Sequence, residues 1–161
     1  MSARPPQFKA ATVRVQAALA QAGLDVEIVR VDEIARTAEG AATAVGATVG
    51  QIVKSLVFLA AGVPVLALVS GSNRLDTTKL AAQTGGPITR ADADVVRSAT
   101  GYAIGGIPPL GHATDLPVYC DRDLLGHDLV WAAAGTPDTV FAVAPELLVH
   151  AVAAHVCDLA E

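Results

Sequence analysis

A single lysine within a run of apolar residues is the first indication of chemistry in this sequence. The run, residues 50–58, reads Gly-Gln-Ile-Val-Lys-Ser-Leu-Val-Phe, and Lys54 has no acidic residue within ten positions on either side. An ammonium group in apolar surroundings loses hydration unless an anion or a solvent-filled cleft receives it. We therefore expect Lys54 to bind an anionic ligand. The alternative is an edge-strand lysine whose stem lies on the apolar surface while its charge reaches water and discourages edge pairing.

A loop rich in glycine and proline, residues 101–117, is the second candidate. Gly105 and Gly106 would let the main chain approach a ligand closely, whereas Pro108 and Pro109 restrict the backbone. The composition predicts a stiff loop whose N–H and C=O groups point in fixed directions, suitable for holding an ester or a water molecule. A surface crossover without a ligand would have the same composition.

Other familiar catalytic patterns are missing from the sequence. It has no Gly-Lys-Ser/Thr phosphate loop, no Gly-x-Ser-x-Gly elbow and no His-x-x-x-His pair, so we expect no metal and no cofactor. His112, just past the loop, is either a general base or an exposed loop histidine. Arg74 and Lys79 flank Asp76 and could add positive charge beside Lys54, although solvated charges at a helix entry are a commoner explanation.

Length and composition restrict the class of protein. The 161 residues are 52% hydrophobic but only 4% aromatic, which predicts a single domain, 1–161, with an aliphatic core and no aromatic platform for bases. The formal charge of −5 argues against general affinity for nucleic-acid backbone, so we expect no DNA partner. No apolar segment resembles a signal peptide or spans a bilayer, so a cytoplasmic protein without membrane contact is expected. Cys120 and Cys157 are expected to be buried, reduced thiols.

Hydrophobic periodicity and capping residues indicate the elements that must position these groups. Helices are predicted at 8–22, 37–45, 77–83, 91–100 and 145–154. Strands are predicted at 25–31, in a hairpin over 51–70, at 118–120, 129–133 and 139–143, and near residue 156. Hairpins interspersed with helices predict an α+β fold with a mixed, mostly antiparallel sheet.

Four segments carry a resemblance to a known family. They read Thr-Ala-Glu-x-Ala-Ala (37–42), Gln-Ile-Val-Lys-Ser-Leu-Val (51–57), Arg-Leu-Asp-x-x-Lys-Leu-Ala (74–81) and Thr-Gly-Tyr-x-x-Gly-Gly-x-x-Pro-x-Gly (100–111), and Asp-Leu-Pro-Val (115–118) and Ala-Ala-Gly-Thr (133–136) extend them. In this order and spacing they resemble the YbaK/prolyl-tRNA synthetase-associated domain family, which edits mischarged tRNA. The resemblance covers most of the chain and implies the fold of that family, with a barrel-like β core surrounded by helices.

The resemblance also implies a reaction, a hydrolysis of the ester that joins a wrong amino acid to the 3′-terminal adenosine of tRNA. The essential lysine of the family falls on Lys54, which would bind the phosphate or sugar of the terminal nucleotide. The family's loop falls on Gly105, Gly106 and Pro109, whose backbone would position the acyl carbonyl and the attacking water, with the ribose hydroxyl assisting. The substrate-binding residues expected on the same basis are Ser70, Arg74, Tyr102, Ile107, His112 and Gly135.

The sequence leaves the substrate and the partners open. Pro108 stands where many free-standing members have serine, and Thr139 where synthetase-inserted members have a pocket histidine. The expected ligand is the 3′ end of a mischarged tRNA carrying a small non-cognate amino acid such as alanine or cysteine, on tRNA-Pro for example. An aminoacyl-tRNA synthetase could supply affinity that the acidic chain lacks, and the protein is expected to be a monomer or a homodimer. The alternative function is a non-catalytic module that binds a tRNA end, a nucleotide or a protein.

Overall fold

The computed structural model describes residues 7–31 and 37–161. Its helices are α1 (Ala10–Gln21), α2 (Ala38–Val45), α3 (Thr77–Thr84), α4 (Ala93–Thr100) and α5 (Pro145–Val152), with two 3-10 turns, η1 (Val49–Gln51) and η2 (Arg122–Gly126). Its strands are β1 (Ile28–Arg30), β2 (Val53–Ala60), β3 (Val63–Ser70), β4 (Ile88–Arg90), β5 (Val118–Asp121), β6 (Val130–Ala133), β7 (Thr139–Val143) and β8 (His155–Cys157). No helix among these residues is long and apolar enough to cross a membrane.

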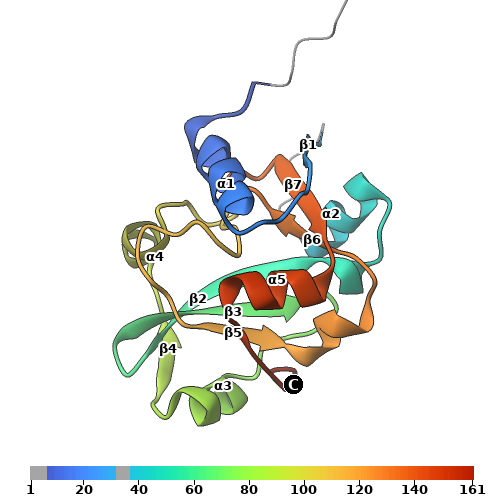
Figure 1. Cartoon of the computed structure of the whole chain (residues 1–161). Helices are drawn as coiled ribbons and strands as arrows, with labels where there is room; N and C mark the ends of the chain where they lie inside the picture. The colour runs from blue at the N-terminus through green and yellow to red at the C-terminus, as the bar shows by residue number, and fades with distance from the viewer. Residues whose placement is uncertain (1–6, 32–36) are drawn as a thin grey trace, which may run out of the picture.

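The strands form two sheets (Figure 1). One has five strands in the order β4-β2-β3-β5-β8, and the other has three in the order β1-β7-β6. The pairs β3–β5 and β5–β8 are parallel, whereas the remaining pairs are antiparallel. The predicted α+β fold with a mixed, mostly antiparallel sheet is confirmed. The barrel-like core needs a correction, because over the described residues the two sheets do not close into a barrel.

The predicted hairpin over 51–70 is confirmed and forms the centre of the larger sheet. β2 and β3 pair from Val53 opposite Ser70 to Ala60 opposite Val63. Ala61 and Gly62 have φ angles of 48° and 83°, so the two-residue turn lies in the left-handed region that matches strand twist. The hairpin therefore fixes the register of the strand that carries Lys54.

The predicted helices are all present, and their ends are set by capping residues. Thr37 and Asp76 accept hydrogen bonds from the first turns of α2 and α3. Asp92, expected inside the first turn of α4, is instead its N-cap and accepts from the N–H of Val95. Strand β4 could not be predicted from the sequence, because its three residues are of mixed polarity and show no usable alternation.

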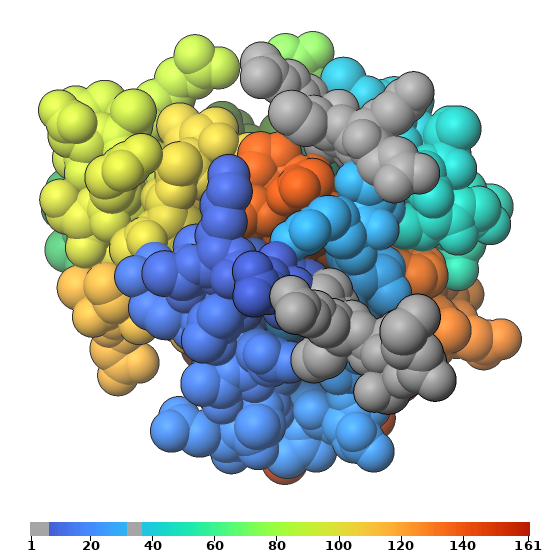
Figure 2. All heavy atoms as spheres, turned by 90° about the horizontal axis from the view of Figure 1, so that it is seen from above, coloured from blue at the N-terminus to red at the C-terminus, as the bar shows by residue number. Residues whose placement is uncertain are grey.

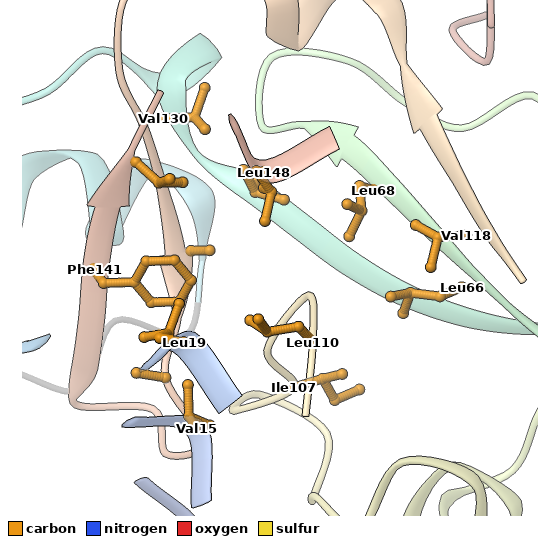
Figure 3. Close-up of a cluster of buried hydrophobic side chains, with 14 of the residues drawn as sticks. Val15, Leu19, Leu66, Leu68, Ile107, Leu110, Val118, Val130, Phe141 and Leu148 are labelled. Carbon is orange, nitrogen blue, oxygen red and sulfur yellow. The ribbon is translucent and has the colours of Figure 1, made fainter. Parts of the chain in front are cut away.

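Two apolar clusters lie on opposite faces of the β2–β3 hairpin. The larger one fills the space between the sheets and α1. In Figure 3, Leu110 and Leu148 lie between Phe141 and Leu19 on one side and Leu66 and Leu68 on the other. The smaller one, on the other face of β3, lies under α3 and consists of Ala67, Val69, Leu80 and Leu159.

The two cysteines are free thiols, as the sequence predicted. Cys120 is buried in β5, and burial raises the pKa of its thiol to about 12. Cys157, in the neighbouring strand β8, is only partly buried, so the prediction that both thiols are buried is wrong for this residue. Neither residue lines the cavities described below.

Candidate functional site

The candidate site is a stretch of β2 whose outer edge has no strand partner among the described residues. At one end Ile52 forms an isolated parallel bridge with Trp131 of β6. At the other end β4 pairs with β2 only from Phe58 to Ala60. The two sheets diverge between these points, which exposes main chain that a regular sheet would cover.

Ser55 directs its main chain toward this open edge. The carbonyl oxygen of Ile52 accepts a hydrogen bond from the N–H of Gly71, which belongs to β3's side of the hairpin. Along an antiparallel strand, the main-chain N–H and C=O groups of successive residues point alternately to the two edges. The residues at even positions from Ile52 onward therefore bond to β3, whereas the N–H and C=O groups of Ser55 point away from β3. The hydroxyl of Ser55 is also buried, with no hydrogen-bond partner among the described residues. The main-chain N–H and C=O groups of Ser55 thus lie at the open edge, and its hydroxyl lies on the face of β2 that carries Val53 and Val57.

A cavity of about 530 Å³ lies along this edge. Its described walls come from α2, β2, β4, α4, β6 and β7 and from Ile104, Gly105 and Ile107, and they are mostly apolar. Lys54, Ser55, Arg90 and Thr37 supply the main polar groups. The volume falls within the range of about 300–1,000 Å³ that is usual for small-molecule sites.

Lys54 lies at the rim of the cavity and is half-buried. Its Cα is paired with Val69, so the side chain leaves β2 on the face of the smaller apolar cluster. The Nζ group donates a hydrogen bond to the main-chain carbonyl of Asn73. The charge therefore has a neutral acceptor rather than a carboxylate as its recorded partner, which leaves it available to an anionic ligand.

A buried carboxylate holds the segment that receives Lys54. Asp121 has no exposed surface, and its Oδ2 accepts hydrogen bonds from the Nδ2 of Asn73 at 2.8 Å and the N–H of Ser70 at 3.2 Å. Its Oδ1 accepts from the N–H of Asp123 at 3.0 Å. Through Asn73, these contacts fix the carbonyl group on which the Lys54 ammonium rests.

The glycine- and proline-rich loop lies beside α1, where Figure 2 shows its yellow atoms next to the blue helix. The hydroxyl of Tyr102 donates to the carbonyl of Gly111 at 2.9 Å, and the Nε2 of His112 donates to the carbonyl of Pro108 at 2.7 Å. Burial is the larger influence on His112 and lowers the pKa of its ring, although the hydrogen bond to Pro108 opposes the shift. The loop is thus held by its own side chains, with Gly105 exposed at the cavity.

The structure brings together some of the residues that the sequence indicated. Lys54, Gly105 and Ile107 line the same cavity. The side chain of Lys54 leaves β2 on the face of the smaller apolar cluster, whereas Ile107 packs in the larger cluster on the opposite face. The wall can include both because it wraps around the open edge of the strand. Arg74 lies outside this cavity and lines a second one on the other side of Lys54.

The remaining residues that the sequence indicated lie in segments that support the walls of the site. They are Gly106, Pro109, Ser70, Tyr102, His112 and Gly135, none of which is in the described lining of either cavity. The carbonyl of Gly106 accepts from the N–H of Gly135, and the hydroxyl of Ser70 donates to the carbonyl of Gly50. These contacts use the polar groups of those residues within the protein.

Sequence reasoning missed three residues at the cavity: Ser55, Arg90 and Trp131. Ser55 was visible as the neighbour of Lys54 on the opposite face of the strand. Arg90 and Trp131 carried no local signal, because they reach the cavity through the pairing of β4 with β2 and the bridge to Ile52.

Comparison with known proteins gives consistent relatives. A sequence model described as the aminoacyl-tRNA editing domain matches residues 32–151. A crystal structure described provisionally as a trans-editing enzyme for prolyl-tRNA synthetase has a TM-score of 0.92 and 49% identity, covering 96% of this chain and 99% of that chain.

Two curated relatives carry names that concern tRNA. A protein of Enterococcus faecalis (strain ATCC 700802 / V583), provisionally named Cys-tRNA(Pro)/Cys-tRNA(Cys) deacylase EbsC, is 29% identical over 114 residues, which are 70% of each chain. The proline--tRNA ligase of Citrifermentans bemidjiense (strain ATCC BAA-1014 / DSM 16622 / JCM 12645 / Bem) is 35% identical over 105 residues, which are 65% of this chain and 18% of the ligase.

Proposed function

The chain belongs to the aminoacyl-tRNA editing domain family, and on that basis we propose that it is a trans-acting aminoacyl-tRNA deacylase. Its substrate is a tRNA mischarged with a small non-cognate amino acid such as alanine or cysteine, with tRNA-Pro as the favoured carrier. The observation that carries the proposal is that Lys54 and Gly105, fifty-one positions apart, line one cavity at the open edge of β2.

In the proposed reaction, a water oxygen attacks the carbonyl carbon of the ester. The bond between that carbon and the ribose oxygen breaks, which releases the amino acid and restores the ribose hydroxyl. Lys54 exchanges the carbonyl of Asn73 for the phosphate or sugar of the terminal nucleotide, since a charged acceptor binds an ammonium more strongly than a neutral one. The ligand is thereby held across the rim of the cavity.

Ser55 and the loop complete the proposed arrangement. The hydroxyl and main-chain groups of Ser55 hydrogen-bond the aminoacyl group, and the exposed backbone at Gly105 positions the carbonyl and the water. The neighbouring ribose hydroxyl assists the proton transfer. Preorganised donors of this kind stabilise the charge that develops on the carbonyl oxygen during attack.

The choice of amino acid and tRNA is supported by the relatives rather than by the cavity. The named functions of the Enterococcus protein and of the prolyl-tRNA synthetase both concern tRNA-Pro or cysteine esters. The mostly apolar walls suit a small side chain. The 105 matched residues are only 18% of the synthetase. We propose that this domain acts in trans in the cytoplasm, with a synthetase as partner.

The test is to follow ester loss from tRNAs charged with alanine, cysteine, serine or proline. We expect wild-type protein to hydrolyse at least one of the non-cognate esters, and Lys54→Ala to reduce kcat/KM by about 10²-fold. Lys9→Ala is the control, since Lys9 is an exposed lysine outside both cavities and should leave the rate unchanged.

Two outcomes would contradict the proposed function. If no ester is lost but the protein still binds the tRNA end, the chain is a binding module. If Lys54→Ala and wild type hydrolyse at equal rates, Lys54 has no part in the reaction.

A further inference from the structure

A second cavity of about 320 Å³ adjoins the first. The two cavities share four lining residues, Lys54, Leu56, Phe58 and Arg90. The second extends from this common border toward the entry of α3, where Arg74 and Leu75 lie. The two cavities therefore form neighbouring compartments along β2, with Lys54 at the boundary.

Every charged residue in the described lining of the second cavity is a cation. These residues are Lys54, Arg74 and Arg90. The concentration is unusual for this protein, because the whole chain has 11 basic and 16 acidic residues. Arg74 pairs with Glu161, which lies outside the described lining, whereas no ion pair is found for Lys54 or Arg90 among the described residues. The wall therefore carries an excess of positive charge that attracts anions.

The arginines are accessible to a ligand. The side chain of Arg74 is 87% exposed, and its Nε lies 3.2 Å from Glu161. An exposed ion pair of this kind contributes little stability, so an incoming phosphate can replace it. Arg90 is also exposed, and no ion pair with it is recorded among the described residues. Asp76, which lies beside Leu75, has its carboxylate turned to the N–H groups of Thr78 and Lys79.

The floor of the second cavity is apolar. Leu56, Phe58, Leu75 and Ile88 line it and pack against the smaller apolar cluster. An apolar floor with one aromatic ring under a cationic rim matches a nucleotide, whose base stacks while its phosphate meets the cations. A simple inorganic anion would need only the rim.

We propose that the second cavity binds the nucleotides that precede the terminal adenosine of a single-stranded RNA 3′ end. Arg74 and Arg90 contact their phosphates, and Phe58 and its apolar neighbours contact a base. The inference rests on the proposed function, because the first cavity must hold the terminal nucleotide for the chain to continue past Lys54 into the second. The cavity adds affinity for the RNA and takes no part in bond cleavage.

The experiment compares two substrates that differ in their upstream phosphates. One is tRNA mischarged with alanine, and the other is the alanyl ester of adenosine 5′-monophosphate, which carries the terminal phosphate alone. Arg74→Gln should raise KM for the tRNA by roughly tenfold, the value of one charge-assisted contact, with little change in kcat. The rise in KM should be several times smaller for the mononucleotide ester.

Salt dependence gives a second readout for the same variant. Each phosphate contact in a single strand contributes about 0.7 to the slope of log affinity against log salt concentration, so Arg74→Gln should flatten the slope by that amount. Arg97→Gln is the matched control, because Arg97 is an exposed arginine of α4 outside both cavities. It should retain the KM and the salt slope of wild type.

The outcomes separate this inference from the proposed function. If Arg74→Gln has the same KM for tRNA as wild type, or if its KM rises equally for both substrates, the second cavity does not hold upstream nucleotides. If wild type hydrolyses neither alanyl substrate, binding of a fluorescent single-stranded RNA that ends in CCA tests the cavity directly. The proposed function itself fails only if no non-cognate ester of the panel described above is lost. A Kd for Arg74→Gln equal to that for Arg97→Gln would then overturn the inference.

Discussion

Asp121 is the residue on which the position of Lys54 depends most directly. Its carboxylate is fully buried, and three donors satisfy it: the main-chain N–H groups of Ser70 and Asp123 and the side-chain amide of Asn73. A buried carboxylate is stable only when its oxygens are hydrogen-bonded. The carbonyl group of Asn73, which accepts the hydrogen bond from Lys54, is therefore held in place by a buried carboxylate that does not line the cavity.

Asp121→Asn should destabilise the protein, because one carboxylate oxygen becomes an NH₂ group that faces existing donors. We expect the free energy of unfolding to fall by about 1–3 kcal/mol, measured by urea denaturation. Asp123→Asn is the control, since the Asp123 side chain accepts one exposed hydrogen bond from Asn73. Its loss should stay below about 1 kcal/mol, and equal losses in the two variants would contradict the role of Asp121.

The ionisation of His112 makes the stability of the protein depend on pH. Burial lowers the pKa of its ring below the ordinary value of 6.5, so the folded protein binds a proton less readily than the unfolded chain does. Between the lowered pKa and 6.5, the unfolded state binds more protons, and stability therefore falls as the pH decreases through this window. Above pH 6.5 both states are neutral at this residue and the effect disappears.

The free energy of unfolding should thus be lower at pH 5.5 than at pH 7.5, and His112→Gln should make the difference smaller. Urea denaturation of both proteins at both pH values measures the effect. If the two proteins lose the same stability on acidification, then His112 is not responsible.

Among the elements, the glycine- and proline-rich loop depends most on close packing. It meets the connection between β6 and β7, where the N–H of Gly135 donates to the carbonyl of Gly106 at 2.9 Å. A Cβ atom on Gly106 would lie 2.7 Å from the carbonyl oxygen of Gly135, and that backbone is itself pressed against Ala11 of α1. The loop, the β6–β7 connection and α1 therefore pack together at Gly106 and Gly135. This packing places Gly105 at the cavity.

Gly106→Ala should move the loop, since backbone on the opposite side cannot yield. Overpacking of this kind costs about 1–3 kcal/mol, which thermal denaturation would register, and a displaced Gly105 should lower kcat. Gly126→Ala tests the specificity of the effect, because a Cβ at Gly126 meets nothing within 4 Å. A stable, fully active Gly106→Ala variant would show that the loop position is unimportant for the reaction.

The molecule as a whole is acidic, and this limits how it can bind RNA. Its formal charge is −5, whereas the cations at the two cavities are Lys54, Arg74 and Arg90. Under the two proposals above, recognition is therefore confined to a short stretch of phosphates at the 3′ end. A partner that binds the rest of the tRNA would supply the remaining affinity.

The salt dependence of tRNA binding should accordingly be shallow. Three single-strand phosphate contacts predict a slope of log affinity against log salt concentration no steeper than about −2. Fluorescence anisotropy with labelled tRNA at several salt concentrations measures this slope. A value much steeper than −2 would indicate phosphate contacts outside the two cavities.

The sequence by itself determined the family and all the helices and strands named here except β4. Local rules suffice for helices that begin at Thr37 or Asp76 and for a hairpin that turns at Ala61 and Gly62, because caps and turns are made by residues close together in the chain. The motifs around Lys54 and Gly105 likewise identified the family from consecutive residues, without information on what lies opposite them.

Only the tertiary structure decided which residues face a cavity. Alternation assigns Lys54 and Ser55 to opposite faces of a strand, but it does not tell which edge of that strand is paired. The edge is open because the two sheets diverge after Ile52 and β4 begins to pair only at Phe58. That open edge leaves the main-chain groups of Ser55 without a strand partner and places Lys54 on the border of two compartments. The pairing of β4 with β2 adds Arg90 to the walls of both, through contacts between residues distant in the sequence.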